Sequence, residues 1–291
     1  MKSNHLKKII IGTAHFGQTY GIKKINISED DAREIILLSK SLNIDLVDTS
    51  PSYGEAEAIL GKSNLKKMSV ITKLPQMPLE VKNKEKWISE ILCRSLKKLN
   101  LSSFHAVLFH DPQIFYKNEA KQIYKILCKL KEEKILSSVG ASIYSPKILK
   151  KIFPEYKLDI IQAPINLFDQ RILSQKYLDL LKKNKVDIHA RSIFLQGLLL
   201  DEKNFESKYF LKWKKKFLEV KKIASNNNIS LLELCLGFIN SNEHIEKFLI
   251  GIDSINQLKM IASSLNKQIL IEEDLKFLSS NDKNLIDPRR W

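Results

Sequence analysis

Four polar side chains of types that can move protons stand at or just beyond the ends of short apolar segments: Asp48, Tyr53, Lys73 and His110. The segments have the composition of buried β-strands and are Ile44–Asp48, Ser69–Lys73 and Ala106–His110. Tyr53 follows the first segment by five residues. Charged groups at the ends of buried strands are costly unless they pair with one another. We therefore expect the four residues to share one site.

The chemistry open to this group is proton transfer. Burial would lower the affinity of Lys73 for a proton unless an acid lies nearby, and Asp48 would supply that charge. A tyrosine beside an ammonium loses its proton more easily than a free phenol of pKa about 10, so Tyr53 could act as a general acid. His110 could orient a substrate oxygen or complete the relay.

Each of these residues also has a structural interpretation. Lys73 and Asp48 could form an ion pair, Tyr53 could pack in a loop, and His110 could end a strand before a turn. Purely structural roles are much less probable for all four residues together, since they occur in this order on neighbouring strands. The combination favours a functional site.

The segments that must position this site alternate between strand-like and helix-like patterns. The expected strands are Lys8–Thr13, Ile44–Asp48, Ser69–Lys73, Phe104–His110, Ser137–Ala141, Asp159–Ala163, Val186–Ser192 and Lys247–Ile250. The clearest expected helices are Glu29–Leu42, Trp87–Leu99, Glu119–Lys134, Leu173–Lys183 and Ile255–Leu265. This alternation predicts an α/β fold, a (β/α)8 TIM barrel in which residues 1–291 form a single domain. A doubly wound sheet would carry a GxGxxG turn after the first strand, which Gly12-Thr-Ala-His-Phe-Gly17 does not match.

Local signals refine this prediction. Ser28 and Ser230 have the character of helix N-caps, and residues 199–209 are polar and aperiodic, which predicts a mobile loop over one end of the barrel. Seven of the nine glycines fall at expected strand ends, which fits a ligand site at the barrel mouth: Gly12, Gly17, Gly21, Gly54, Gly61, Gly197 and Gly251.

The composition excludes several classes of protein. No segment approaches the ~18 continuous apolar residues of a membrane span, and the basic N-terminus lacks the features of a signal peptide, so we expect a cytoplasmic protein. The formal net charge is +15, but lysines spread along helix faces without a groove-reading motif favour no nucleic-acid partner. The three cysteines stand in helix-like stripes, so reduced core thiols and no metal site are expected: Cys93, Cys128 and Cys235.

With these residues in place, the sequence resembles the aldo-keto reductase family over nearly its whole length. Asp48-Thr-Ser-Pro-Ser-Tyr-Gly-Glu-Ala-Glu57 is similar to the family signature D-T-A-x-x-Y-G-x-x-E, and Ile11–Gly17 resembles its opening strand. Lys73 and His110 fall where the family places its lysine and histidine. The resemblance implies that Tyr53 is the proton donor, assisted by Lys73 and Asp48, and that His110 orients the carbonyl of a small-molecule substrate.

The resemblance also implies NADPH bound across the barrel mouth. Gly140-Ala-Ser142 and Gln162-Ala-Pro-Ile-Asn166 match the positions that hold the carboxamide, and the segment that begins at Arg191 resembles the loop over the pyrophosphate. The positions expected to bind the cofactor are Gly12, Thr13, Ser142, Gln162, Asn166, Arg191, Ser192, Gly197, Gly251, Ser254 and Gln257.

Three residues depart from the family pattern. Arg191 stands where a tyrosine usually stacks on the nicotinamide, although a guanidinium plane can also stack. Ile143 replaces a common asparagine. Asp253 lies near the expected 2′-phosphate, which would favour NADH, although NADPH remains the preferred expectation.

The remaining questions concern substrate and alternatives. Specificity is expected from the loops around Tyr20, Pro75–Leu79, Phe115–Tyr116 and Leu199–Tyr209, and the family analogy suggests small carbonyls or sugar derivatives.

The C-terminal Asp287–Trp291 could cover the cofactor or anchor the fold, and we favour the anchor. Alternative functions are a Schiff-base lyase that uses Lys73 and a non-catalytic cofactor-binding or regulatory barrel.

Overall fold

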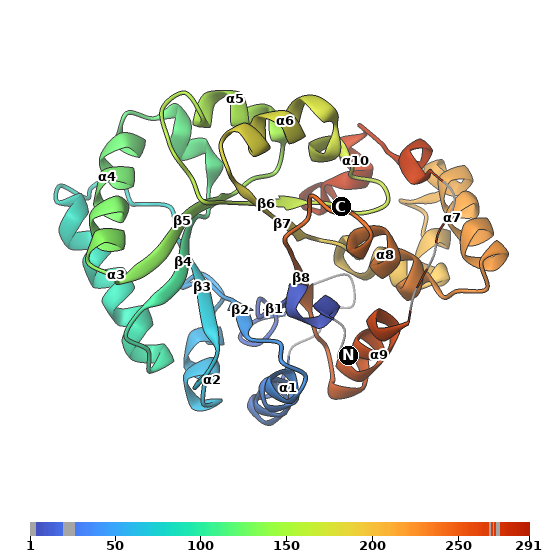
Figure 1. The fold of residues 1–291 in the computed structure, drawn as a ribbon, viewed down its shortest axis with the longest axis horizontal. Coiled ribbons are helices and arrows are strands. Elements are labelled where there is room, and N and C mark those ends of the chain that lie inside the picture. Colours follow the sequence, from blue (N-terminus) through green and yellow to red (C-terminus); the bar gives the residue numbers. More distant parts are fainter. Residues whose placement is uncertain (1–3, 20–26, 268, 270, 272–273) are drawn as a thin grey trace.

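Eight parallel strands close into a barrel in the order of the sequence (Figure 1). The computed structural model describes residues 4–19, 27–267, 269, 271 and 274–291. The strands are β1 (Ile9–Gly12), β2 (Leu46–Asp48), β3 (Ser69–Leu74), β4 (Phe104–Phe109), β5 (Leu136–Ser142), β6 (Ile160–Pro164), β7 (Asp187–Arg191) and β8 (Lys247–Gly251). β8 pairs with β1 and closes the ring. The predicted (β/α)8 barrel is confirmed.

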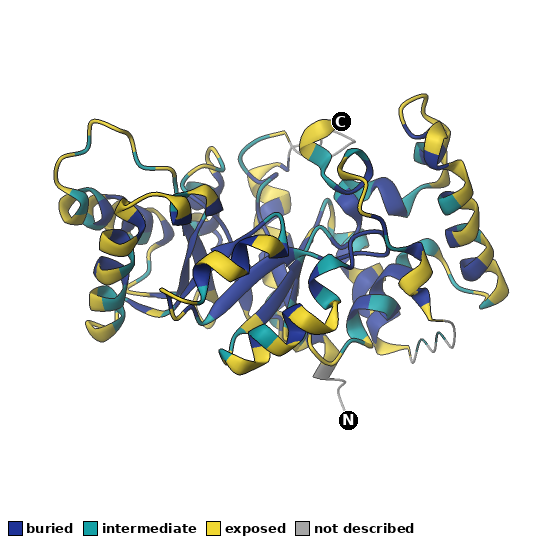
Figure 2. Ribbon diagram, turned by 90° about the horizontal axis from the view of Figure 1, so that it is seen from above, coloured by how far each residue is buried: buried dark blue, intermediate teal, exposed yellow. Residues whose placement is uncertain are grey.

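Helices surround the barrel and leave their outer faces exposed, while the strands are buried (Figure 2). The helices are α1 (Glu29–Ser41), α2 (Ala56–Lys62), α3 (Lys84–Leu99), α4 (Glu119–Glu132), α5 (Leu149–Ile152), α6 (Gln175–Lys183), α7 (Lys214–Asn226), α8 (Leu231–Asn240), α9 (Ile255–Asn266) and α10 (Lys283–Ile286). Ser28 and Ser230 cap α1 and α8 as predicted. α3 begins three residues before its predicted start because Asn83 accepts a hydrogen bond from the backbone N–H of Lys86.

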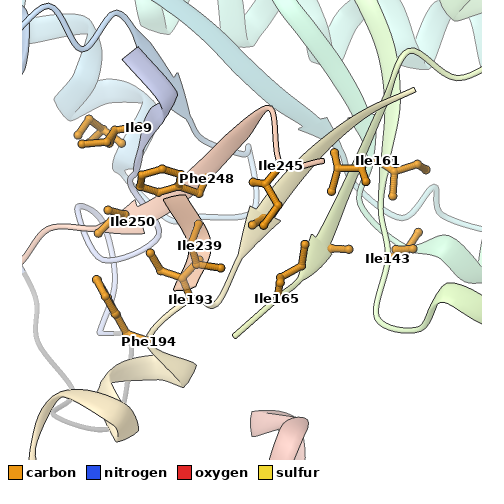
Figure 3. Close-up of a cluster of buried hydrophobic side chains, with 14 of the residues drawn as sticks. Ile9, Ile143, Ile161, Ile165, Ile193, Phe194, Ile239, Ile245, Phe248 and Ile250 are labelled. Atoms are coloured by element: carbon orange, nitrogen blue, oxygen red, sulfur yellow. The ribbon is translucent and has the colours of Figure 1, made fainter. Parts of the chain in front are cut away.

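The core has an outer and an inner layer, as parallel strands covered on both faces require. The outer layer lies between strands and helices, where Figure 3 shows Ile9 of β1, Phe248 of β8 and Ile239 of α8. The inner layer is a cluster of aliphatic side chains inside the barrel. Its members are Ile10, Leu46, Ile71, Ala106, Leu108 and Ile160, with Leu249 packed against them. Each of these residues precedes the end of its own strand, so the layer lies below the strand ends.

Some local expectations were wrong. The segment predicted as a loop without regular structure contains short 3-10 helices at Leu195–Leu200 and Glu202–Glu206, because the side chain of Phe205 is buried against the core. Gly61 does not end a strand; it lies in α2, where it allows close approach to the backbone of α3 at Lys98. Cys93 is exposed rather than in the core.

Two expectations fall outside the described residues, namely those on Tyr20 and Gly21. Among the described residues, no helix is both long and apolar enough to cross a membrane.

Candidate functional site

The four residues of the expected proton relay converge at the mouth of the barrel. Asp48 ends β2, Lys73 is the penultimate residue of β3, and His110 directly follows β4. The ammonium of Lys73 forms an ion pair with Asp48 and also donates to the backbone carbonyl of Thr49, at 3.2 Å. Both side chains are almost completely buried, which makes this pair the most enclosed charge in the site.

Tyr53 lies against both basic residues of the group. The Lys73 Nζ is 4.9 Å from the centre of the Tyr53 ring, and the two side chains also share a hydrogen bond. The ring of Tyr53 meets that of His110 edge to face, with centroids 5.8 Å apart. The hydroxyl of Tyr53 is therefore next to an ammonium and the ring is next to an imidazole.

The electrostatics of the group keep Lys73 charged. Burial is the largest influence and lowers its pKa, but the charges of Asp48 and Tyr53 and hydrogen bonds to both outweigh it, so the pKa lies above the ordinary value. A protonated lysine beside a phenol stabilises the phenolate. This arrangement eases proton donation by Tyr53.

His110 is uncharged at neutral pH. Burial, followed by the positive charges of Lys73 and Arg191, lowers its pKa to about 4. Its Nδ1 lies 3.4 Å from the hydroxyl of Ser50. A neutral imidazole can donate one N–H to a substrate oxygen while the other nitrogen accepts.

A cavity of about 390 Å³ opens above these four residues. Its wall includes most of the positions expected to bind the cofactor, and that subset consists of Gly12, Thr13, Ser142, Gln162, Arg191, Ser192, Gly197, Gly251 and Gln257. The structure thus brings these residues and the proton relay to one space. Asn166 and Ser254 do not line it.

Gln162 and Ser142 extend the relay rather than standing apart from it. The amide of Gln162 donates to the second carboxylate oxygen of Asp48, at 2.9 Å, and accepts from the hydroxyl of Ser142, at 3.3 Å. Asp48 therefore bonds Lys73 through one oxygen and Gln162 through the other. Sequence reasoning assigned Gln162 to the cofactor alone and missed this second contact.

The two residues that were expected to bind the cofactor but do not line the cavity, Asn166 and Ser254, form hydrogen bonds with the nearby backbone. Asn166 is fully buried; its amide donates to the carbonyl of Ser192, and its side-chain oxygen accepts from the backbone of Phe168 and Asp169. Ser254 caps α9 by accepting from the N–H of Gln257. These hydrogen bonds position the loops after β6, β7 and β8 that border the cavity.

The loop after β7 has an unusual backbone. Ser192, Leu195 and Gln196 have φ values of 54°, 49° and 55°, and Gly197 has 90°. Left-handed conformations at residues other than glycine cost free energy and cluster at ligand-binding sites. Turns of this kind also present backbone N–H groups to anions.

The loop after β8 carries the one acid expected to bear on cofactor choice. The side chain of Asp253 is 40% exposed and lies 3.8 Å from the Nε2 of His15. Gln257 accepts from the backbone N–H of Asp253, at 2.6 Å, and donates to its carboxylate, at 3.3 Å. His15, which sequence reasoning did not assign, lines the same wall and bonds the carbonyl of Ile252, at 2.7 Å.

Three further residues of the cavity wall were missed or misjudged from the sequence: Tyr144, Arg171 and Arg289. The C-terminal segment does more than anchor the fold, because Asp287, Pro288 and Arg289 line the cavity. It is also anchored, since the ring of Trp291 contacts that of Phe210 with centroids 4.9 Å apart. Arginine is rare in this lysine-rich chain, and that rarity was the available signal.

Several other expectations can be placed. Pro75–Leu79 lines a smaller cavity of about 80 Å³ that shares His110 with the main one, Phe115 is buried in the core, and Leu200 lines the main cavity. Ile143 is fully buried and points away from the cavity. Within the described part of the chain, no three His, Cys, Asp or Glu side chains are grouped as around a metal ion.

Residues 8–280 match the model of the aldo/keto reductase family. The uncharacterized oxidoreductase YqkF of Bacillus subtilis is 21% identical over 289 positions, covering 90% of this chain and 91% of that protein. D-arabinose 1-dehydrogenase of Saccharomyces cerevisiae is 22% identical over 303 positions, covering 96% and 88%. An aldo-keto reductase of Bacillus halodurans in its holo form superposes with a TM-score of 0.77 at 18% identity, covering 98% of this chain and 95% of that chain.

Proposed function

Because this chain belongs to the aldo/keto reductase family, and is therefore an oxidoreductase, we propose that it reduces a small aldehyde or ketone to an alcohol with NADPH. The observation that carries the proposal is the buried Lys73 ammonium, which bonds both Asp48 and Tyr53 at the floor of the cavity. An ammonium fixed there has a clear chemical use, which is to make the neighbouring phenol a better acid.

In the proposed mechanism, each residue has one task. His110 donates a hydrogen bond to the carbonyl oxygen and orients it. Tyr53 gives its proton to that oxygen as negative charge develops, and Lys73 stabilises the phenolate that remains. Asp48, held by Gln162, fixes the ammonium in place.

The cavity wall suits a nicotinamide cofactor, which would supply the hydride when bound. The left-handed turn from Ser192 to Gly197 lines the cavity where the resemblance places the pyrophosphate. Gly251 and Gln257 lie on the wall where the resemblance places the adenosine end. Gly12 lines the cavity, and its lack of a side chain lets β8 pack closely against it at Leu249 and Ile250.

NADPH remains the proposed cofactor rather than NADH. Asp253 would disfavour a 2′-phosphate if its charge faced the ligand, but the amide of Gln257 donates a hydrogen bond to its carboxylate. The formal net charge of +15 adds a general attraction for the more anionic cofactor.

The alternatives are less well supported by the geometry. A Schiff-base lyase needs a neutral lysine as nucleophile, whereas the pKa of Lys73 is raised despite the opposing effect of burial, because Asp48 and Tyr53 stabilise its charge. A non-catalytic barrel would have no use for the complete relay of four residues.

The decisive experiment is the replacement Tyr53→Phe. We expect kcat/KM for carbonyl reduction to fall by about 10² to 10⁴-fold, because the general acid is lost. Titration of protein fluorescence with NADPH and with NADH should give the same affinities as the unaltered protein, with NADPH the tighter.

A matched control is Tyr177→Phe, which removes the same hydroxyl from a tyrosine of α6 that does not line the cavity. It should leave kcat/KM unchanged. Full turnover by the Tyr53 variant would overturn the proposed mechanism. The substrate panel should include pentoses, tested in the direction of oxidation, because one relative is named a D-arabinose 1-dehydrogenase.

A further inference from the structure

Arginine is scarce in this chain but gathers on one wall of the cavity. Only six of the 48 basic residues are arginine, yet three of them line the cavity: Arg171, Arg191 and Arg289. Lys73 is the only lysine that does so in the described part of the chain. Arginine presents a planar fork that matches carboxylate and phosphate oxygens, whereas lysine is a point charge. The distribution therefore indicates recognition of an oxyanion. We name these three residues the arginine wall.

The arginine wall is organised around Tyr144, which follows β5. Arg171 donates to the backbone carbonyl of Tyr144, at 2.9 Å. The guanidinium carbons of Arg191 and Arg289 lie 4.7 Å and 3.6 Å from the centre of its ring. Both guanidinium groups thus lie against the same ring, and both line the cavity.

The charges on this wall do not balance. Arg171 is matched by Asp169 through two hydrogen bonds of 2.7 Å, and Arg289 is matched by Asp287. Arg191 bonds only neutral acceptors among the described residues, the hydroxyl of Ser192 at 3.2 Å and a backbone carbonyl at 3.0 Å. Its Nε is buried and has no partner within the described part of the chain. A half-buried guanidinium without a carboxylate is unfavourable until an anion arrives.

The unmatched charge faces the reacting end of the cavity. Arg191 is close enough to His110 that its charge helps to lower the pKa of that imidazole, after burial and Lys73. Both side chains line the same space of about 390 Å³. A molecule whose carbonyl bonds His110 can therefore place a second group at the arginine wall.

We propose that the substrate is a small aldehyde or ketone that also carries a carboxylate or phosphate group, which Arg191 and Arg289 bind. The inference rests on the proposed function, since it names the substrate class of the same site. The cofactor has oxyanions of its own, and Ser192 next to Arg191 belongs to the loop proposed for its pyrophosphate. The experiment must therefore separate substrate from cofactor.

Two pairs of substrates isolate the charge. 4-Formylbenzoate and 4-formylbenzamide have nearly the same size but differ in charge. Glyceraldehyde 3-phosphate differs from glyceraldehyde only by its phosphate group. With saturating NADPH, we expect kcat/KM for the anionic member of at least one pair to exceed that for the neutral member by tenfold or more. Ratios within twofold for both pairs would overturn the inference.

Three variants test which arginine recognises the anionic group of the substrate. Arg191→Gln should reduce the ratio of anionic to neutral kcat/KM to below threefold, and Arg289→Gln should reduce it severalfold. Arg290→Gln is the matched control, because Arg290 is the exposed neighbour with the same charge and does not line the cavity; its ratio should equal that of the unaltered protein. A tenfold rise in the KM for NADPH with an unchanged ratio would assign the arginines to the cofactor and overturn the inference.

A binding measurement separates the two proposals if no aldehyde is turned over. In that case the proposed function fails, and calorimetric titration of the NADPH-loaded protein with benzoate and benzamide decides the inference alone. Binding of benzoate at least tenfold tighter than benzamide, lost in Arg191→Gln, would support the anion site. Equal binding of the two would exclude it.

Discussion

Both ends of the barrel interior hold buried ionisable side chains, but the two groups differ in whether neighbouring residues stabilise the charged form. At the mouth, Lys73 keeps its charge because Asp48 and Tyr53 outweigh the effect of burial on its pKa. Towards the base, burial, followed by the charges of His105 and Lys247, lowers the pKa of His189 on β7 to about 3. His189 is uncharged, and its Nδ1 has no partner among the described residues.

This difference distinguishes a site from a filled interior. A fully bonded ion pair at the end of the strands opens into a cavity, where its charge can act on a ligand. A neutral, partly unsatisfied histidine inside the strands faces no cavity lined by the described residues. Replacement should therefore have a much larger effect at the mouth than towards the base.

The largest effect is expected from Lys73→Met. Removal of the ammonium leaves the Asp48 carboxylate buried without its counter-ion, which should lower the free energy of unfolding by about 3–5 kcal/mol and abolish measurable reduction. Urea denaturation and a carbonyl reduction assay measure the two effects. The double replacement Lys73→Met with Asp48→Asn should recover most of the stability and none of the activity. A single variant as stable as the unaltered protein would show that the pair is not a coupled unit.

A much smaller effect is expected from His189→Leu towards the base. Leucine has a similar volume and carries no unsatisfied nitrogen, so the free energy of unfolding should change by less than about 1.5 kcal/mol, in either direction. kcat/KM should stay within twofold of the unaltered protein. A loss of activity comparable to that of the Lys73 variant would remove the distinction between the two ends.

The last effect is absent near neutral pH and is a change in how stability depends on pH. His110 and His189 titrate near 6.5 in the unfolded chain but at about 4 and about 3 when folded, so the unfolded state binds more protons between those values. Both histidines therefore make stability fall as pH decreases from about 6.5. Denaturation at a series of pH values should show a shallower fall for His189→Leu, with no difference in slope above pH 7.5. Parallel curves down to pH 4 would contradict the lowered pKa of His189.

The fold and the relay were predictable because both are encoded locally. Each strand is a short apolar run, and the residue type that ends it can be read directly, as with Asp48 and Lys73. The order of strands around the barrel then places successive strand ends side by side. Residues that end successive strands can therefore be predicted to lie close together, without knowledge of side-chain packing.

The arginine wall was not predictable in the same way. Arg171 and Arg289 are 118 positions apart in the numbering and meet only because the C-terminal turn folds over the loops after β5 and β6. The positions of Asn166 and Ser254 matched a family pattern, yet their hydrogen bonds face their own loops. Such outcomes depend on tertiary contacts between irregular segments.

The aliphatic layer inside the barrel also has a kinetic consequence. Ile10, Leu46, Ile71, Leu108 and Ile160 lie beneath Lys73 and can neither give nor take a proton. Under the proposed function, Tyr53 must regain its proton after each turnover, and this layer bars a supply along the barrel axis. Solvent protons then enter through the same opening as the ligands.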